Sequence, residues 1–324
     1  MRPSTPDPTR TGTGATPRSS RANGEAHRTA CYTTSVEQSL HDKVGVVTGA
    51  SRGIGKGIAL ELGAAGATVY VTGRTVAAGQ NPLPGTVGET AAEIDALGGH
   101  GIAVACDHHD DDEVEALFAR VQRDSGRLDV LVNNVFSAPT MAPWLGKPFW
   151  ELPIEAWDEM IDIGARSHYV ASRFAAPLLF ATGGGVIVNV SSSGAVQYAH
   201  NVAYGVGKAA LDKMTADMAH ELESHQVAVV SIWPGLVRTE LVTLGARETE
   251  DGRRVLGLPG EGEFDLADAE SPRFAGRAVV ALATDHQVMA RTGRAFPVAT
   301  LAADYGFTDV DGRSAGVQIR PETG

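Results

Sequence analysis

The stretch Thr48-Gly49-Ala50-Ser51-Arg52-Gly53-Ile54-Gly55 decides the fold of this chain. It lies between a short apolar run at residues 44–47 and a run with helical spacing, as expected where a strand turns into a helix. Gly49 lets the chain turn off the strand, Gly53 lets the backbone approach an anion, and Gly55 permits close packing of the helix. Because the helix N-terminus then faces the anion, this spacing predicts a turn that holds a dinucleotide pyrophosphate.

The alternation of strand and helix continues along the chain. Short apolar runs predict buried strands, and longer runs with helical periodicity predict helices. The expected strands are residues 44–47, 68–71, 102–106, 130–132, 186–190, 227–232 and 294–297, and the expected helices are residues 54–62, 112–122, 154–179, 204–222 and 272–283. Continuous apolar strands separated by helices indicate a parallel sheet covered on both faces. We therefore expect an α/β fold, a Rossmann-type doubly wound parallel sheet, in a single domain over residues 39–324.

Charge and composition exclude several classes of protein. The net charge is −12, and residues 1–35 contain five arginines and two acidic residues, so the rest of the chain carries −15. A body this acidic repels a phosphate backbone, and we expect no nucleic-acid partner. Cys31 and Cys106 form neither a disulfide framework nor a metal pattern, and no apolar run reaches the ~18 residues of a membrane span. We expect a soluble, cytoplasmic protein.

Residues 1–38 differ in composition from the rest of the chain. They are rich in Thr, Pro, Arg, Ser, Gly and Ala and contain almost no large aliphatic side chain. Such a segment cannot bury enough apolar area to offset the entropy of ordering, which predicts a disordered basic tail. An organelle presequence is the alternative, but the prolines in this segment would break its amphipathic helix.

The glycine spacing reads TGxxxGxG, and this pattern resembles the short-chain dehydrogenase/reductase superfamily. The similarity extends over nearly all of residues 42–310. Four segments resemble more closely the dehydrogenase/reductase member 1 branch of that superfamily, namely GRLDVLVNN at residues 126–134, FWE at 149–151, YGVGKAA at 204–210 and WPG at 233–235. The resemblance implies an oxidoreductase that uses a nicotinamide dinucleotide.

The end of the second expected strand distinguishes NADP from NAD. An NAD enzyme needs a carboxylate there for the ribose 2′-hydroxyl, and this carboxylate would repel a 2′-phosphate. This chain has Gly73 followed by Arg74, and a guanidinium group suits phosphate binding. Together with Arg52 of the glycine turn, Arg74 would clamp a 2′-phosphate, so we expect NADP. The alternative is that both arginines are solvated surface residues.

Three residues predict a reaction centre. Tyr204 and Lys208 are four apart on an expected helix and so share one face. Reduction of a carbonyl needs an acid near its oxygen, and an adjacent ammonium lowers the pKa of a phenol toward a useful range. Ser192 follows the strand at residues 186–190 and can donate to the oxygen where charge develops. The resemblance implies the same roles: Tyr204 as acid and base, Lys208 also holding the nicotinamide ribose, and Ser192 orienting the carbonyl.

The resemblance extends to residues that hold the coenzyme. Residues 234–239 match a PGxVxT segment that binds the nicotinamide carboxamide in the family. Asp107 and Asn133 match positions that contact adenine, although the usual NNAG is changed here to Asn133-Asn134-Val135-Phe136. The complete expected set of coenzyme-binding residues is Gly49, Ser51, Arg52, Gly53, Ile54, Gly55, Arg74, Asp107, Asn133, Tyr204, Lys208, Pro234, Gly235, Val237 and Thr239.

One residue implied by the resemblance is missing. The family often has an asparagine on the long central helix, where it holds a water that relays protons through the lysine, and this chain has Gly164 there. Either the relay is altered, with a water in the vacated space, or activity is lost. We expect NADP(H)-dependent interconversion of a hydrophobic ketone or aldehyde and its alcohol. The alternatives are a 3-oxoacyl-thioester reductase and a catalytically weak NADP-binding sensor or partner protein.

No metal is expected, because residues 108–113, HHDDDE, open an expected helix whose positive end favours carboxylates. Two loops are long, at residues 76–88 and about 240–272, and we expect the second to bind the small-molecule substrate. The resemblance implies a homodimer or homotetramer that pairs through the helices at residues 154–179 and 204–222.

Overall fold

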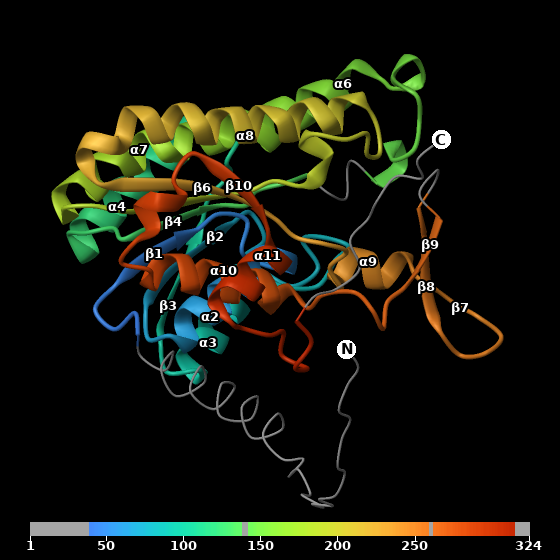
Figure 1. Cartoon of the computed structure of the whole chain (residues 1–324), viewed down its shortest axis with the longest axis horizontal. Coiled ribbons are helices and arrows are strands. Elements are labelled where there is room, and N and C mark those ends of the chain that lie inside the picture. Colours follow the sequence, from blue (N-terminus) through green and yellow to red (C-terminus); the bar gives the residue numbers. More distant parts are fainter. Residues whose placement is uncertain (1–38, 138–141, 259–261, 315–324) are drawn as a thin grey trace, which may run out of the picture.

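The computed structural model describes residues 39–137, 142–258 and 262–314, and the tail predicted at residues 1–38 lies outside this part. A sheet of seven strands runs through the centre, in the spatial order β10-β6-β5-β4-β1-β2-β3 (Figure 1). All its neighbouring strands are parallel. The strands are β1 (Val44–Val47), β2 (Thr68–Gly73), β3 (His100–Ala105), β4 (Val130–Asn133), β5 (Gly185–Val190), β6 (Val227–Trp233) and β10 (Arg294–Pro297). The predicted Rossmann-type fold is confirmed.

Helices cover both faces of the sheet. One layer consists of α2 (Gly53–Ala64), α3 (Val87–Ala96), α10 (Pro272–Thr284) and α11 (Val298–Tyr305), and the other of α4 (Asp111–Ser125), α7 (Ser167–Thr182) and α8 (Val202–Leu222). Successive strand residues point to opposite faces. Val47 and Val71 therefore belong to the core under the first layer, and Val46 and Tyr70 to the core under the second.

The order of the strands creates a crevice beside β1. Val47 is paired with Val71 of β2 on one side and with Val132 of β4 on the other. The chain passes from β1 to β2 in one direction and from β4 to β5 in the other, so the connections diverge at the carboxyl ends of β1 and β4. In doubly wound sheets, ligands bind at this switch point.

The long helix expected at residues 154–179 is divided into three parts. α6 (Ile154–Asp158) continues into a π-helical segment, η3 (Glu159–Arg166), which leads into α7. Segments of π-helix are rare in proteins, and those that occur are often found at functional sites. Gly164 and Met160 are buried within η3. The structure has helix throughout the predicted range, with π-helical hydrogen bonding between the two α-helical parts.

The charged segment after β6 contains structure that its sequence does not predict. It begins with α9 (Glu240–Gly245) and forms an antiparallel sheet of β7 (Arg247–Glu248), β8 (Arg254–Leu258) and β9 (Gly262–Asp265). Figure 1 shows this unit projecting beside the central sheet. The remaining short helices are η1 (Ala142–Trp144), η2 (Phe149–Glu151), η4 (Ser193–Ala195), η5 (Glu223–His225) and η6 (Val288–Arg291).

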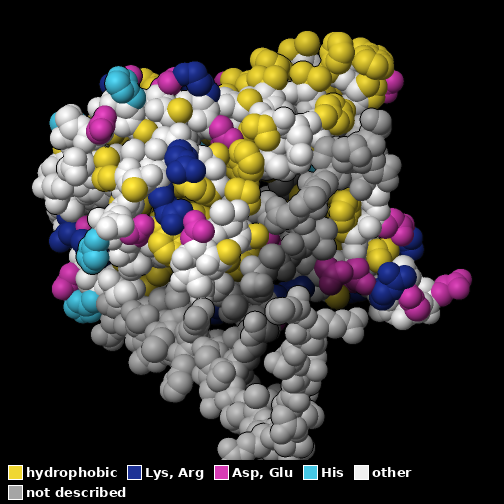
Figure 2. Space-filling view, viewed as in Figure 1, with side chains coloured by type: hydrophobic (Ala, Val, Ile, Leu, Met, Phe, Trp, Pro, Cys, Tyr) yellow, Lys and Arg dark blue, Asp and Glu magenta, His cyan; other side chains and the backbone are white. Residues whose placement is uncertain are grey.

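Hydrophobic side chains gather on the surface over α6 and its neighbourhood, at the upper right of Figure 2. Phe149, Trp150, Ile154 and Trp157 are exposed in this part of the chain. No helix within the described residues is long and apolar enough to cross a membrane.

Candidate active site

The glycine turn joins β1 to α2 in a conformation that requires glycine. Gly49 and Gly53 have φ angles of 64° and 59°, in the left-handed region. A Cβ on Gly55 would lie 2.3 Å from Asn134 Nδ2 and 2.4 Å from the carbonyl oxygen of Gly49. The third glycine therefore lets α2 begin directly against the loop that follows β4.

A cavity of about 410 Å³ opens at the carboxyl ends of the strands beside this turn. The glycine turn contributes Gly49, Ser51, Arg52, Gly53 and Ile54 to its lining. The other predicted residues that line it are Arg74, Asp107 and Thr239. Most of the expected coenzyme site is thus brought together, and the volume lies within the usual range for ligand pockets.

The N-terminus of α2 faces a carboxylate. The backbone N–H of Gly53 donates a hydrogen bond of 2.8 Å to Glu240 Oε2, although α2 has no acidic residue in its own first turn. The positive end of a helix attracts negative charge, so this point of the cavity accepts an anionic oxygen. Glu240 is missing from the predicted set because it is remote in sequence, and its position directly after Thr239 is the one signal that could have indicated it.

The two predicted arginines lie in different environments. Arg74 has 62% of its side chain exposed, and its Nη1 lies 3.8 Å from Asp107 Oδ2. Arg52 is held by the loop beside it, since it donates to the carbonyl oxygens of Pro84 at 2.9 Å and Gly85 at 2.8 Å. Both arginines therefore line the cavity, as the expected clamp requires, but Arg52 is also bonded to the neighbouring loop whereas Arg74 is mostly exposed.

Asn133 does not line the cavity. Its side chain is fully buried and donates to Ser172 Oγ and to Asn189 Oδ1, each at 2.9 Å. A side-chain contact of Asn133 with adenine does not fit this position. Asn134 lines the cavity instead and donates to the carbonyl oxygens of Thr48 and Gly49 at 3.0 and 3.1 Å.

Ser192, Tyr204 and Lys208 meet between β5 and α8. The hydroxyl of Tyr204 donates to Ser192 Oγ at 3.0 Å, and Lys208 Nζ donates to the carbonyl oxygen of Val190 at 3.1 Å. Asn201 caps α8 by accepting from the backbone N–H of Tyr204 at 2.9 Å, which fixes the start of the helix. The predicted triad is thus assembled in space.

Lys208 is buried beneath this centre. Burial lowers the pKa of Lys208 to about 8, and the carboxylate of Asp212 opposes that shift. The Nζ atom lies 5.1 Å from the ring centre of Phe136 and 5.8 Å from that of Tyr204. Because Phe136 also lines the cavity, the triad lies directly beside the predicted coenzyme site.

Met160 occupies space beside Gly164. Its Cε lies 3.2 Å from the point where a Cβ on Gly164 would be placed, and 2.9 Å from the equivalent point on Gly207. One turn later, His168 Nε2 lies 3.2 Å from the carbonyl oxygen of Val135. Burial lowers the pKa of His168 to about 3, with the charge of Lys208 as the second cause. The methyl group of Met160 thus lies against the Gly164 position, and His168, which the sequence does not indicate, follows one helical turn later.

The segment that follows β6 is fixed by a buried glutamate. The backbone N–H of Gly235 donates to Glu270 Oε2 at 2.9 Å, and Val237 forms a parallel bridge with the same residue. Thr239 caps α9, since its Oγ1 accepts from the N–H of Val242 at 3.3 Å. Its hydroxyl hydrogen is left to donate elsewhere. Pro234 lies between the end of β6 and Gly235.

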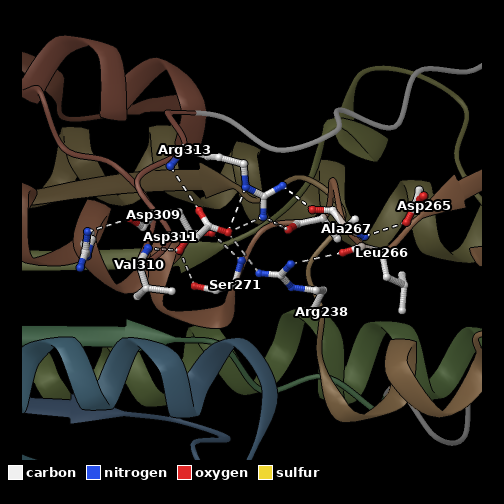
Figure 3. A network of polar contacts seen from close by, with 11 residues as sticks. Arg238, Asp265, Leu266, Ala267, Ser271, Asp309, Val310, Asp311 and Arg313 are labelled. Carbon is white, nitrogen blue, oxygen red and sulfur yellow. Dashed lines mark hydrogen bonds and ion pairs between the residues drawn. The ribbon is translucent and has the colours of Figure 1, made fainter. Parts of the chain in front are cut away.

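The far end of the charged segment is held by the chain near residue 313 (Figure 3). Arg313 donates to the carbonyl oxygens of Ala267 at 2.5 Å and Ala269 at 3.1 Å, and it is also paired with Asp311 at 2.6 Å. Arg238 donates to the carbonyl oxygen of Leu266 at 3.3 Å. The base of the expected substrate loop is therefore fixed from both sides.

The residues considered as metal ligands belong to a helix cap. Asp110 accepts from the N–H groups of Asp112 and Glu113 at the start of α4, as predicted. His108 is buried and lies 2.8 Å from Thr72 Oγ1. In the described parts of the chain, no group of three or more His, Cys, Asp or Glu side chains could hold a metal ion.

Comparison with known proteins identifies the family. The sequence pattern of the short chain dehydrogenases matches residues 43–249. The chain belongs to the short-chain dehydrogenase family. This short-chain dehydrogenase is 46% identical over 278 residues to dehydrogenase/reductase SDR family member 1 of Mus musculus, covering 85% of each chain. The resemblance read from the sequence is confirmed.

Solved short-chain dehydrogenases have the same fold. A metagenomic short-chain oxidoreductase in complex with NADP is 31% identical, with a TM-score of 0.60 over 77% of this chain and 94% of its own. A 7 alpha-hydroxysteroid dehydrogenase complexed with NADH and 7-oxo glycochenodeoxycholic acid is 26% identical, with a TM-score of 0.65 over 81% and 95%. Structural relatives thus bind either coenzyme.

A short-chain dehydrogenase uses a nicotinamide coenzyme, and the residues around the cavity fit one. Gly49 and Gly53 have no side chain, so the backbone of the turn lines the cavity directly. The Gly53 N–H donates to a carboxylate oxygen at the position where a phosphate oxygen would bind. Lys208 Nζ lies 5.1 Å from the ring centre of Phe136, which lines the cavity, and the hydrogen-bonded pair of Tyr204 and Ser192 lies beside this lysine.

Proposed function

We propose that this oxidoreductase interconverts a ketone or aldehyde and the corresponding alcohol. Hydride passes between NADP(H) and the carbonyl carbon, and Tyr204 acts as general acid and base. The observation that carries the proposal is the 3.0 Å hydrogen bond between the Tyr204 hydroxyl and Ser192 Oγ, beside a buried lysine. A bound nicotinamide supplies the hydride. The side chains supply position, a proton and compensation for developing charge.

Each member of the triad has a separate task. Tyr204 gives its hydroxyl proton to the carbonyl oxygen during reduction and takes a proton from the alcohol in the reverse direction. Ser192 donates to the same oxygen, where negative charge develops. The Lys208 ammonium, 5.8 Å from the Tyr204 ring, stabilises the phenolate that remains after proton transfer.

The environment of Arg74 supports NADP. Its guanidinium lines the cavity at the end of β2, is mostly exposed and lies 3.8 Å from the nearest carboxylate oxygen of Asp107. Such a group is available to a 2′-phosphate, and charge-assisted hydrogen bonds to phosphate are strong. Arg52 supports the site indirectly by holding the loop at Pro84 and Gly85.

The surroundings of Tyr204 support an apolar substrate. Phe136, Trp144, Met160 and Ala203 pack together with its ring. A hydrophobic ketone or aldehyde would complete this cluster, and the structural relative that binds a 7-oxo bile acid conjugate is consistent with this substrate class. A 3-oxoacyl thioester remains the alternative substrate.

Steady-state oxidation of NADPH against a panel of carbonyl compounds tests the proposal. The panel includes apolar ketones, aldehydes and 3-oxoacyl thioesters, and NADPH binding is measured separately by fluorescence titration. We expect turnover with an apolar ketone or aldehyde. Binding of NADPH without turnover of any carbonyl would favour the weakly catalytic sensor, for which Met160 beside Gly164 is the motivating observation.

We also propose cytoplasmic location and assembly as a homodimer or homotetramer. Exposed Tyr169 on α7 and Val206 on α8 support pairing through these helices. Light scattering of the purified protein is expected to give two or four times the mass of 33.8 kDa, and a stable monomer would contradict this assembly.

A further inference from the structure

A carboxylate lies on the same face of α8 as the reacting groups. Asp212 follows Lys208 by four residues and Tyr204 by eight, so the three side chains follow one another along the helix. Ser231 Oγ donates to Asp212 Oδ1 at 2.6 Å, and Trp233 Nε1 donates to Oδ2 at 3.0 Å. Asp212 therefore ties α8 to β6 one turn below the buried lysine.

The charge of Asp212 acts on Lys208. Burial raises the pKa of Asp212, and the hydrogen bonds from its neighbours and the ammonium of Lys208 offset part of this rise. Lys208 is surrounded by the carbonyl oxygen of Val190 on β5, the ring of Phe136 after β4, Tyr204 on its own helix and the neutral His168 on α7. Asp212 supplies the negative charge that keeps the ammonium form favourable in this buried place.

Asp212 also reaches the segment predicted to hold the nicotinamide. Trp233 ends β6 and is followed directly by Pro234 and Gly235. The tryptophan is fixed by Asp212, and the N–H of Gly235 is fixed by Glu270 at 2.9 Å. Two carboxylates thus hold this turn, one from the lysine helix and one from the segment before α10.

We propose that Asp212 is a positioning residue of the reaction centre, which joins the turn containing Lys208 to the Trp233-Pro234-Gly235 segment and places a carboxylate one helical turn from the lysine. Asp212 does not touch the substrate. Its effect reaches the reaction through the charge of Lys208 and the placement of the nicotinamide segment. This inference rests on the proposed function for its kinetic consequences, and its effect on Lys208 can be measured without turnover.

The direct test is titration of Lys208 by NMR in protein labelled with ¹³C at the lysine ε-carbon. The signal is assigned by its loss in Lys208→Arg. Wild type is expected to titrate near the value of about 8 that burial produces. Asp212→Asn is expected to lower the midpoint by about one pH unit, because the ammonium loses its neighbouring charge. Asp212→Glu is expected to restore most of the difference.

Kinetic measurements form the second arm. In Asp212→Asn, loss of the ammonium at lower pH is expected to move the alkaline limb of the kcat profile for reduction to lower pH and to reduce kcat about tenfold. Trp233→Phe keeps the charge but removes one donor, so it is expected to raise the KM for NADPH without moving that limb. Asp217→Asn is the matched control, since this exposed aspartate on α8 is paired with Lys213.

The outcomes separate the two proposals. A folded Asp212→Asn variant with the lysine midpoint and the alkaline limb of wild type would overturn the role of Asp212. If Asp212→Asn does not fold, the test uses Asp212→Glu and Ser231→Ala, which both retain the carboxylate. The Lys208 midpoint is then expected to stay near that of wild type. A shift of one pH unit in either variant would also overturn the role of Asp212. Failure of wild type to reduce any carbonyl would refute the proposed function while leaving the NMR result to decide on Asp212.

Discussion

Glu240 of α9 and Gly53 of α2 are joined by a hydrogen bond of 2.8 Å, although 187 residues separate them in the sequence. The carboxylate lies at the positive end of α2, where a pyrophosphate oxygen is expected. At the proposed site, coenzyme binding would replace the Glu240 carboxylate by a pyrophosphate oxygen. The first residue of the predicted substrate loop and the glycine turn are coupled through this exchange.

Replacement of Glu240 by Gln is expected to tighten NADPH binding about threefold to tenfold. The substitution removes a negative charge that competes with the pyrophosphate, a change of about 1 kcal/mol. Fluorescence titration of Glu240→Gln and wild type measures it, with Glu248→Gln on exposed β7 as the control. Weaker binding in Glu240→Gln would mean that the carboxylate shapes the site rather than competing for it.

Arg74→Asp is expected to weaken NADPH binding about 10-fold to 100-fold and NADH binding far less. The loss is that of charge-assisted hydrogen bonds to the 2′-phosphate, with repulsion added. Arg52→Ala is expected to weaken both coenzymes to a similar extent, because Arg52 holds the loop at Pro84 and Gly85. Equal losses for the two coenzymes in Arg74→Asp would refute selection by this residue.

The buried His168 predicts a loss of stability in acid. Its pKa in the folded protein is about 3, below the ordinary value of 6.5, so the unfolded chain binds more protons between these values. The free energy of unfolding therefore falls as pH is lowered from 6.5 toward 3. Urea unfolding at several pH values is expected to show a smaller decrease in His168→Gln than in wild type or in the exposed control His220→Gln. The same slope in all three would contradict the assignment.

Arg313 is expected to control the substrate loop from a distance. Arg313→Ala removes the donors to Ala267 and Ala269 and the partner of Asp311 (Figure 3). We expect the KM for the carbonyl substrate to rise about threefold to tenfold with little change in kcat, because only part of the ~1.5–3 kcal/mol that hydrogen bonds from a charged group contribute is transmitted to substrate binding. Arg120→Ala, which removes an exposed ion pair on α4, is the control. An unchanged KM would show that the loop keeps its position without this network.

The features that the sequence predicts correctly are local. The glycine turn is recognisable because its positive φ angles at Gly49 and Gly53 admit few other residues, and the strands because both their faces are buried. The pair Tyr204 and Lys208 follows from helical spacing alone. These signals need no knowledge of contacts between distant parts of the chain.

The features that the sequence does not predict depend on such contacts. Asn133 is the last residue of β4, and its side chain lies in the core, where it donates to Ser172. Asn134 lines the cavity instead. Which of the two adjacent asparagines faces the cavity depends on the orientation of the strand end. The segment that follows β9 is held by Arg313, far along the chain, through the carbonyl oxygens of Ala267 and Ala269. Within the π-helical segment around Gly164, Met160 packs against Gly207 of α8. None of these relationships leaves a periodic pattern in the sequence.

The most direct test of the account is the effect of one hydroxyl group on turnover. The comparison measures kcat with an apolar carbonyl substrate and affinity for NADPH in wild type, Tyr204→Phe and the matched control Tyr70→Phe. The hydroxyl of Tyr70 lies 2.7 Å from Ser125 Oγ, and Tyr70 is not among the described residues that line the cavity. Loss of a general acid is expected to lower kcat by about 10²–10⁴ in Tyr204→Phe with NADPH binding retained, while Tyr70→Phe keeps the kcat of wild type. Equal kcat values in Tyr204→Phe and wild type would contradict Tyr204 as the acid and base.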